Sequence, residues 1–247
     1  MTVAALEALL GARTDIRRGD APADALPARA SGYAPLDAAL PGGGWPTSAV
    51  TELLVERTGI GELSLLLPTL RVLTRDEGCD VALVAPPHTP FAPALVNAGI
   101  ALERLLIIDP PGPSDALWAS ERLLRSGRFA AVLLWASRTT PARQRRLQLA
   151  AVQGASLGVV YRPIDQAADH SPVALRLMLR ALDGVLQIDP LKVRGGAGRA
   201  VALAPQLFDD PQGVPWPIVA ATAPFTSAST PTPTSEPRAR VVSLNRR

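Results

Sequence analysis

The chain has 247 residues, of which 47% are hydrophobic, 19% charged and 4% aromatic. This apolar content excludes a collagen, a coiled-coil rod and a fully disordered chain, and a net charge of +3 does not by itself indicate nucleic-acid binding. The single cysteine, Cys79, excludes an intrachain disulfide and favours a reducing compartment, so we expect a cytoplasmic protein. Because no apolar run approaches the ~18 residues of a membrane span, we expect no membrane partner, and we expect no signal peptide.

The first 30 residues are predicted to precede the core. Residues 2–11 have the pattern of a short amphipathic helix that ends at Gly11. Residues 12–30 are polar and rich in proline and alanine, which is typical of a linker. The predicted N-terminal unit, a helix with its linker, therefore spans residues 1–30.

From Ser31 onward, short apolar runs alternate with segments of helical periodicity. This alternation over residues 31–206 predicts an α/β core built on a parallel sheet with flanking helices. The predicted strands are nearly continuous apolar runs, as in strands covered on both faces, at 49–55, 80–86, 104–110, 129–136, 156–163, 183–190 and 199–205. The predicted helices lie between them at 60–76, 91–98, 114–127, 141–154 and 171–181.

The regular pattern stops after Gln206, and residues 207–247 are predicted to be a flexible tail. Its last part, 223–247, is rich in serine, threonine and proline and then basic, so it cannot bury enough apolar surface to become ordered alone. A small apolar island with flanking arginines is the candidate partner-binding part of this tail. Its residues are Arg238, Arg240, Val241, Val242 and Leu244.

The start of the core carries a glycine-rich motif. Residues 32–54 resemble the opening of the RecA/RadA recombinase core, in which such a segment leads into a strand that ends near a glutamate. The matching positions are Gly32, Leu36, Asp37, Leu40, Gly42, Gly43, Gly44, Pro46 and Glu52. The resemblance implies a RecA-like fold for the core and places a phosphate loop directly after the first core strand.

The phosphate loop, however, is degenerate. A working loop needs a lysine for the outer phosphates and a hydroxyl for Mg²⁺, in the pattern G-x-x-x-x-G-K-[ST]. Here Gly61 stands at the second glycine, Glu62 at the lysine and Leu63 at the hydroxyl, and the only lysine of the chain is Lys192. The degenerate loop comprises Glu56, Gly59, Gly61, Glu62 and Leu63, and its glycines also fit a plain strand-to-helix turn.

Other positions of the recombinase pattern are altered as well. Trp135 stands where that family carries its metal-linked aspartate, Pro87 where it carries the glutamate that orients water, and Pro163 near its nucleotide-sensing glutamine. We therefore expect a pseudo-ATPase without catalytic residues, cofactor or enzymatic activity. No metal site is expected either, because His88 and His170 have no partners at ligand spacing.

This combination of a RecA-like opening and a lost nucleotide site resembles the ImuA family of translesion-synthesis accessory proteins. Those proteins are grouped with SulA-type division inhibitors as degenerate RecA-like proteins. The resemblance implies a DNA-damage (SOS) role in mutagenesis, with an ImuB-type inactive Y-family polymerase, an error-prone polymerase III alpha subunit and RecA as expected partners. Two alternatives stay open: a SulA-like inhibitor that binds a tubulin-like polymer, and a DNA-dependent RecA-like ATPase.

The densest basic cluster surrounds the start of the predicted helix 141–154. It consists of Arg138, Arg143, Arg145 and Arg146. Such a cluster fits weak contacts with the phosphates of single-stranded DNA, a patch for an acidic partner protein, or a solvated helix face. The segment 164–173, at the place of the second DNA loop of recombinases, has no arginine or lysine, which argues against recombinase-like DNA binding.

Overall fold

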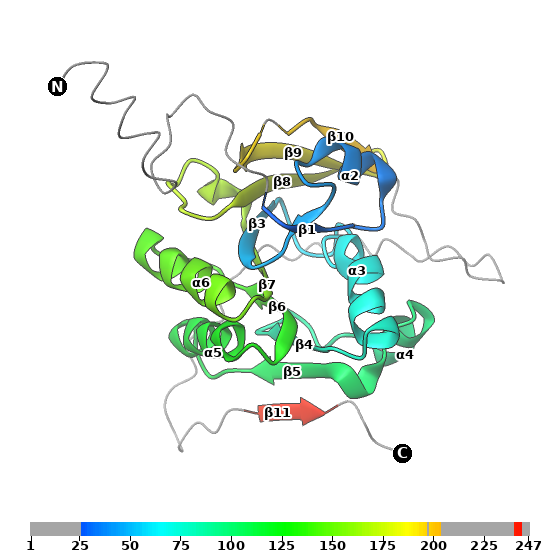
Figure 1. Cartoon of the computed structure of the whole chain (residues 1–247), viewed down its shortest axis with the longest axis vertical. Coiled ribbons are helices and arrows are strands. Elements are labelled where there is room, and N and C mark those ends of the chain that lie inside the picture. Colours follow the sequence, from blue (N-terminus) through cyan, green and yellow to red (C-terminus); the bar gives the residue numbers. More distant parts are fainter. Residues whose placement is uncertain (1–25, 197, 204–239, 244–247) are drawn as a thin grey trace, which may run out of the picture.

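A nine-stranded sheet forms the centre of the computed structural model, which describes residues 26–196, 198–203 and 240–243 (Figure 1). Its strands are β3 (Ala49–Val55), β4 (Asp80–Val84), β5 (Leu105–Asp109), β6 (Phe129–Trp135), β7 (Leu157–Pro163), β8 (Leu175–Leu182), β9 (Val185–Val193), β10 (Val201–Leu203) and β11 (Arg240–Ser243). They lie in the order β10-β9-β8-β3-β7-β6-β4-β5-β11. Neighbours from β8 to β5 in this order are parallel, whereas β9, β10 and β11 pair antiparallel.

Helices cover the two faces of this sheet. They are α2 (Ala34–Ala39), α3 (Leu67–Arg71), α4 (Ala92–Asn97), α5 (Pro113–Ser126) and α6 (Pro141–Gln153), with short turns η1 (Ser64–Leu66), η2 (Val72–Asp76), η3 (Leu102–Arg104) and η4 (Ile164–Gln166). Figure 1 shows α5 and α6 together on one side of the central strands, with α3 and α4 on the other side. The molecule is thus a mixed α/β structure with a mostly parallel sheet and flanking helices, as the strand and helix pattern predicts.

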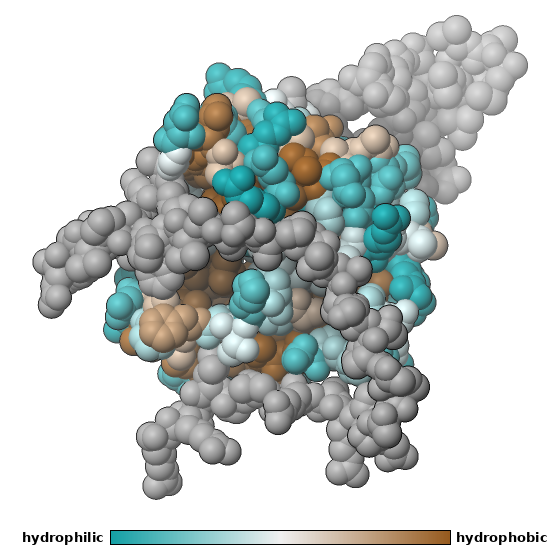
Figure 2. Space-filling view, turned by 180° about the vertical axis from the view of Figure 1, so that it is seen from behind, coloured by the Kyte–Doolittle hydropathy of each residue, from teal (hydrophilic) through white to brown (hydrophobic). Residues whose placement is uncertain are grey.

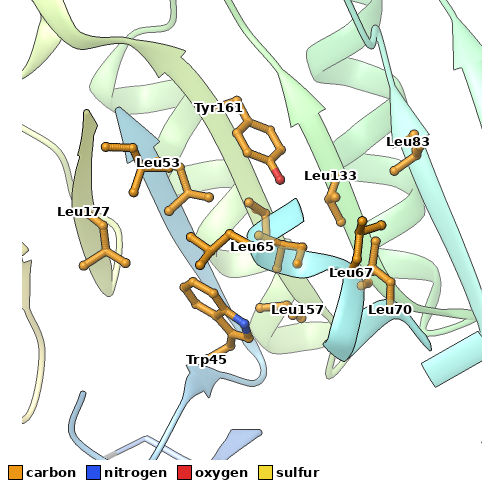
Figure 3. Packing of buried hydrophobic residues seen from close by; sticks show 14 of the residues in the cluster. Trp45, Leu53, Leu65, Leu67, Leu70, Leu83, Leu133, Leu157, Tyr161 and Leu177 are labelled. Carbon is orange, nitrogen blue, oxygen red and sulfur yellow. The ribbon is translucent and has the colours of Figure 1, made fainter. Parts of the chain in front are cut away.

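The strands send alternate side chains into two separate cores. Leu53, Leu83 and Leu133 join the cluster that contains α3, and Figure 3 shows Leu53 on the side of Leu65 and Leu133 on the side of Leu67. Residues on the opposite face of the same strands, such as Val50, Ala82 and Val132, join the second cluster under α5 and α6. Because both faces of the central strands are covered, these strands appear in the sequence as continuous apolar runs.

The predicted helix over residues 171–181 is wrong. Residues 175–182 form β8, in which Leu175, Leu177 and Leu179 are buried on one side of the strand. Leucine, methionine and arginine favour helices intrinsically, but burial of every second residue against the neighbouring strands overrides that preference.

The strand β8 turns directly into β9 through a tight hairpin. Asp183 and Gly184 both have positive φ angles, 49° and 76°, as a two-residue type I′ turn requires. The pairing of β8 with β9, and of β9 with β10, is antiparallel. The prediction of a parallel sheet is therefore correct for the central strands and wrong for this edge.

The ends of the chain are described only in part. The predicted helix 2–11 and most of the tail, including Arg238 and Leu244, lie outside the described residues. Residues 240–243 are described, and they pair antiparallel with β5, so the prediction of a tail that is disordered throughout is wrong there. A short strand β1 (Ala28–Arg29) pairs with β2 (Trp45–Pro46), which places the last part of the predicted linker in contact with the core.

The described surface is mixed in character. Figure 2 shows hydrophilic residues in teal beside separate hydrophobic residues in brown. None of the helices in the described residues is both long enough and apolar enough to cross a membrane.

Candidate functional site

The loop that follows β3 is the candidate nucleotide site, and a glutamate of the same loop is hydrogen-bonded to its backbone. Gly59 and Gly61 have positive φ angles of 82° and 99°, so the loop needs glycine at both places. The backbone N–H of Gly59 donates to both carboxylate oxygens of Glu62, at 3.0 and 3.1 Å. Glu62 is buried, at 6% exposure. A carboxylate of the chain therefore accepts the N–H donor that a phosphate-binding loop would direct at phosphate.

Two stacked aromatic rings lie behind this loop. Trp135 and Tyr161 stack with centroids 4.5 Å apart, and the Tyr161 hydroxyl donates to the backbone oxygen of Glu62 at 3.3 Å. Burial, followed by the nearby Glu62 carboxylate, raises the pKa of Tyr161 well above its ordinary value. The predicted position of a metal-linked aspartate thus holds a buried indole, which has no oxygen ligand to offer a cation.

The two remaining altered positions are prolines, and Pro163 pairs with Val55, the residue directly before this loop. Pro87 is exposed after β4, and Pro163 ends β7. Within the described ranges, no group of three or more His, Cys, Asp or Glu side chains could hold a metal ion.

The buried ion cluster that lies at the centre of the sheet was not predicted from the sequence. Glu52 on β3 is fully buried and forms ion pairs with Arg162 on β7 and Arg176 on β8. Gln144 on α6 donates its Nε2–H to Glu52 at 2.8 Å. The Glu52 carboxylate is therefore shared by two guanidinium groups that are themselves 1% and 6% exposed. The signal in the sequence was a charged arginine within an apolar run, namely Arg162 in the run that forms β7 and Arg176 in the run that forms β8.

The two buried arginines also hold the segment after β7. Arg176 donates to the backbone oxygens of Gln166, Ala167 and Asp169 at 3.2, 3.2 and 3.0 Å. Arg162 reaches the Asp169 carboxylate at 3.0 Å. The segment at the place of a second DNA loop is thus attached to the sheet from within.

The predicted basic cluster lies at the start of α6, and its four arginines are exposed. Thr140 caps this helix, with its Oγ1 accepting the N–H of Arg143 at 3.3 Å. Arg143 and Arg146 turn toward α5, where they line a hollow of about 200 Å³. Arg145 and Arg138 do not line this hollow, so the structure brings together two of the four residues there.

The α5 side of the hollow carries residues that sequence reasoning did not single out. Trp118 lines it and is 60% exposed, with the Arg122 guanidinium carbon 5.5 Å from the ring centroid. Glu121, at the base, forms ion pairs with Arg146 at 2.8 Å and with Arg125 at 2.6 Å. The meeting of α5 with α6 is a tertiary contact that the spacing within either helix could not reveal.

Comparisons with known proteins bear on the core. Residues 49–158 match the family model described as cell division inhibitor SulA. The cell division inhibitor SulA of Edwardsiella piscicida is 31% identical over 101 residues, covering 41% of this chain and 60% of that protein. Protein ImuA of Caulobacter vibrioides is 30% identical over 152 residues, covering 59% of this chain and 62% of that protein. The chain thus matches about 60% of the length of these curated relatives.

A crystal structure of SulA from Pseudomonas aeruginosa is similar at 30% identity, with a TM-score of 0.40. The match covers 46% of this chain and 97% of that chain. Taken with the family match, the sequence similarities relate residues 49–158 of this chain to the SulA family, with ImuA as a second and distant relative.

Proposed function

We propose that this chain is a non-catalytic protein of the bacterial SOS response that acts as an adaptor in translesion DNA synthesis. Its similarity to both SulA and ImuA supports a role in the response to DNA damage. The proposed partners are an ImuB-type inactive Y-family polymerase, an error-prone polymerase III alpha subunit and RecA. The single observation that carries the non-catalytic part is the Glu62 carboxylate bound within its own loop.

The charge of this loop opposes the binding of a triphosphate. Two like charges ~4 Å apart repel by about 1 kcal/mol in water, and by more where water is excluded. Glu62 is 6% exposed, so water screens it weakly. Leu63, at the hydroxyl position, offers no oxygen for Mg²⁺.

The extent of similarity favours an ImuA-type role over a SulA-type role. The ImuA match runs over 152 residues, whereas the SulA matches run over 101 and 107 residues. The SulA family match ends at residue 158, before β8, β9 and β10. A SulA-like inhibitor of a tubulin-like polymer remains the second candidate, because the SulA family model matches this core.

The tail supplies a second proposed contact of the adaptor. Arg238, Arg240, Val241, Val242 and Leu244 combine apolar residues with arginines that could steer an acidic partner surface. The strand formed by residues 240–243 shows that part of this segment can pair with a sheet edge.

The test of catalysis is phosphate release from ATP by the purified full chain, with and without single-stranded DNA. We expect no turnover above buffer in either condition. DNA-stimulated hydrolysis that disappears in Gly61→Trp would overturn the non-catalytic proposal.

The test of the adaptor role is co-purification with the tagged chain from DNA-damaged cells. Recovery of a Y-family protein together with an error-prone polymerase subunit is the expected result. Recovery of a tubulin-like protein without either of them would replace the adaptor by the division inhibitor.

A further inference from the structure

Trp118 is the most exposed tryptophan among the described residues, and of the aromatic side chains there Phe91 is exposed to a similar extent, at 67%. The exposure of Trp118 is 60%, whereas Trp45 and Trp135 are 0% and 8% exposed. The indole forms part of the wall of the hollow between α5 and α6. A large flat ring that stays in water at the edge of a hollow is available to stack on another flat ring.

Guanidinium groups from both helices surround this indole. Arg122 lies over the Trp118 ring at 5.5 Å, and Arg143 and Arg146 line the hollow from the facing helix. Glu121 pairs with Arg146, whose side chain is still 63% exposed. Among the described residues Arg143 makes no ion pair, and its Nη2 lies 3.4 Å from the Ser114 hydroxyl.

We propose that the hollow between α5 and α6 forms a groove that binds single-stranded nucleic acid. One unpaired base stacks on Trp118, and the adjacent phosphates contact Arg143 and Arg146. An aromatic platform flanked by cations is how proteins bind single strands without reading sequence, since every base has a flat face. The proposal does not depend on the adaptor role, because it rests on this groove alone.

The shape of the groove favours a nucleic acid over an acidic helical peptide. Its volume of about 200 Å³ is below the ~300–1,000 Å³ of a small-molecule pocket, so it suits one ring at a time. A helix that docks in a groove needs a row of apolar contacts. Here Leu117 and Leu147 are only 6% and 2% exposed, which leaves Trp118 as the accessible apolar side chain of the lining.

The experiment measures binding of fluorescein-labelled dT20 to the full chain by anisotropy, with rU20 and a duplex in parallel. We expect single strands to bind more tightly than the duplex. Trp118→Ala should weaken dT20 binding by about 5- to 100-fold, with Trp118→Phe retaining most of it. Arg143→Gln should weaken binding and lower the salt slope by about 0.7. The matched control is Arg180→Gln, an exposed arginine on β8, expected within about 2-fold of wild type.

A second readout separates this groove from the basic tail. Stacking of a base should quench Trp118 emission on adding dT20, and this change should be missing in Trp118→Phe. Equal dT20 affinity of wild type and Trp118→Ala, or preference for the duplex, would overturn the proposal. So would binding of poly-glutamate, but not of dT20 or rU20, in a Trp118-dependent way. Tighter binding of dT20 than rU20 would assign the site to DNA, and the reverse to RNA.

Discussion

Removing the charge of Glu52 should markedly lower the temperature at which this protein unfolds. Glu52→Gln keeps the side-chain shape but leaves Arg162 and Arg176, which are 1% and 6% exposed, without their shared carboxylate. Removal of one partner of a buried ion pair costs about 3–5 kcal/mol, a large part of the ~5–15 kcal/mol that stabilises a typical domain. Since 1 kcal/mol lowers the Tm of a domain of this size by roughly 2–4 °C, we expect a fall of about 6–20 °C.

The assay is thermal unfolding followed by circular dichroism, with Asp169→Asn as the matched control. The Asp169 side chain also pairs with Arg162, but it is 54% exposed, so its loss should cost at most about 1 kcal/mol. A Tm for Glu52→Gln within ~2 °C of wild type would refute the view that this cluster stabilises the sheet. Limited proteolysis should in addition cut Glu52→Gln faster within residues 164–171, because Arg176 holds the backbone there.

Three further changes test the core, the hairpin and the buried ring. Leu133→Asp should abolish folding, because an unpaired charge in the central strand costs several kcal/mol; a soluble variant with the wild-type Tm would contradict the placement of Leu133. Gly184→Ala should cost about 1–2 kcal/mol in urea unfolding, because φ is 76° there; an unchanged midpoint would contradict the turn geometry. Burial raises the pKa of Tyr161, so its contribution to stability should be constant below about pH 10 and be lost above it; the 295 nm tyrosinate signal should rise with unfolding and be smaller in Tyr161→Phe, in which Tyr33 is the one tyrosine left, and a full two-tyrosine signal without unfolding would contradict the burial.

The parts of the fold that follow from local pattern could be predicted. The runs 49–55 and 129–136 are apolar throughout because both faces of those strands are covered, so they became strands as expected. The segment 171–181 was wrongly predicted as a helix because its residue types favour one. Its alternating leucines, and the Asp183–Gly184 pair that follows, were the signals of a hairpin.

The candidate sites depend on contacts between distant parts of the chain. Glu52 lies 110 and 124 residues from Arg162 and Arg176, and no spacing rule connects a strand with arginines so far away. The density of arginines at the start of α6 did predict a basic cluster. The indole of Trp118 belongs to another helix, and only the packing of α5 against α6 brings it beside Arg143.

The strand β11 affects how the tail can be studied by truncation. Its residues 240–243 cover the free edge of β5, a strand of the sequence LLIID, so a chain cut before residue 240 would expose that edge. Uncovered apolar strand edges pair with other chains and promote self-association. A truncated protein that loses its partners could therefore have lost its solubility rather than a binding segment. Point substitutions that keep the backbone of β11 avoid this confusion, and they are the better way to ask what the tail binds.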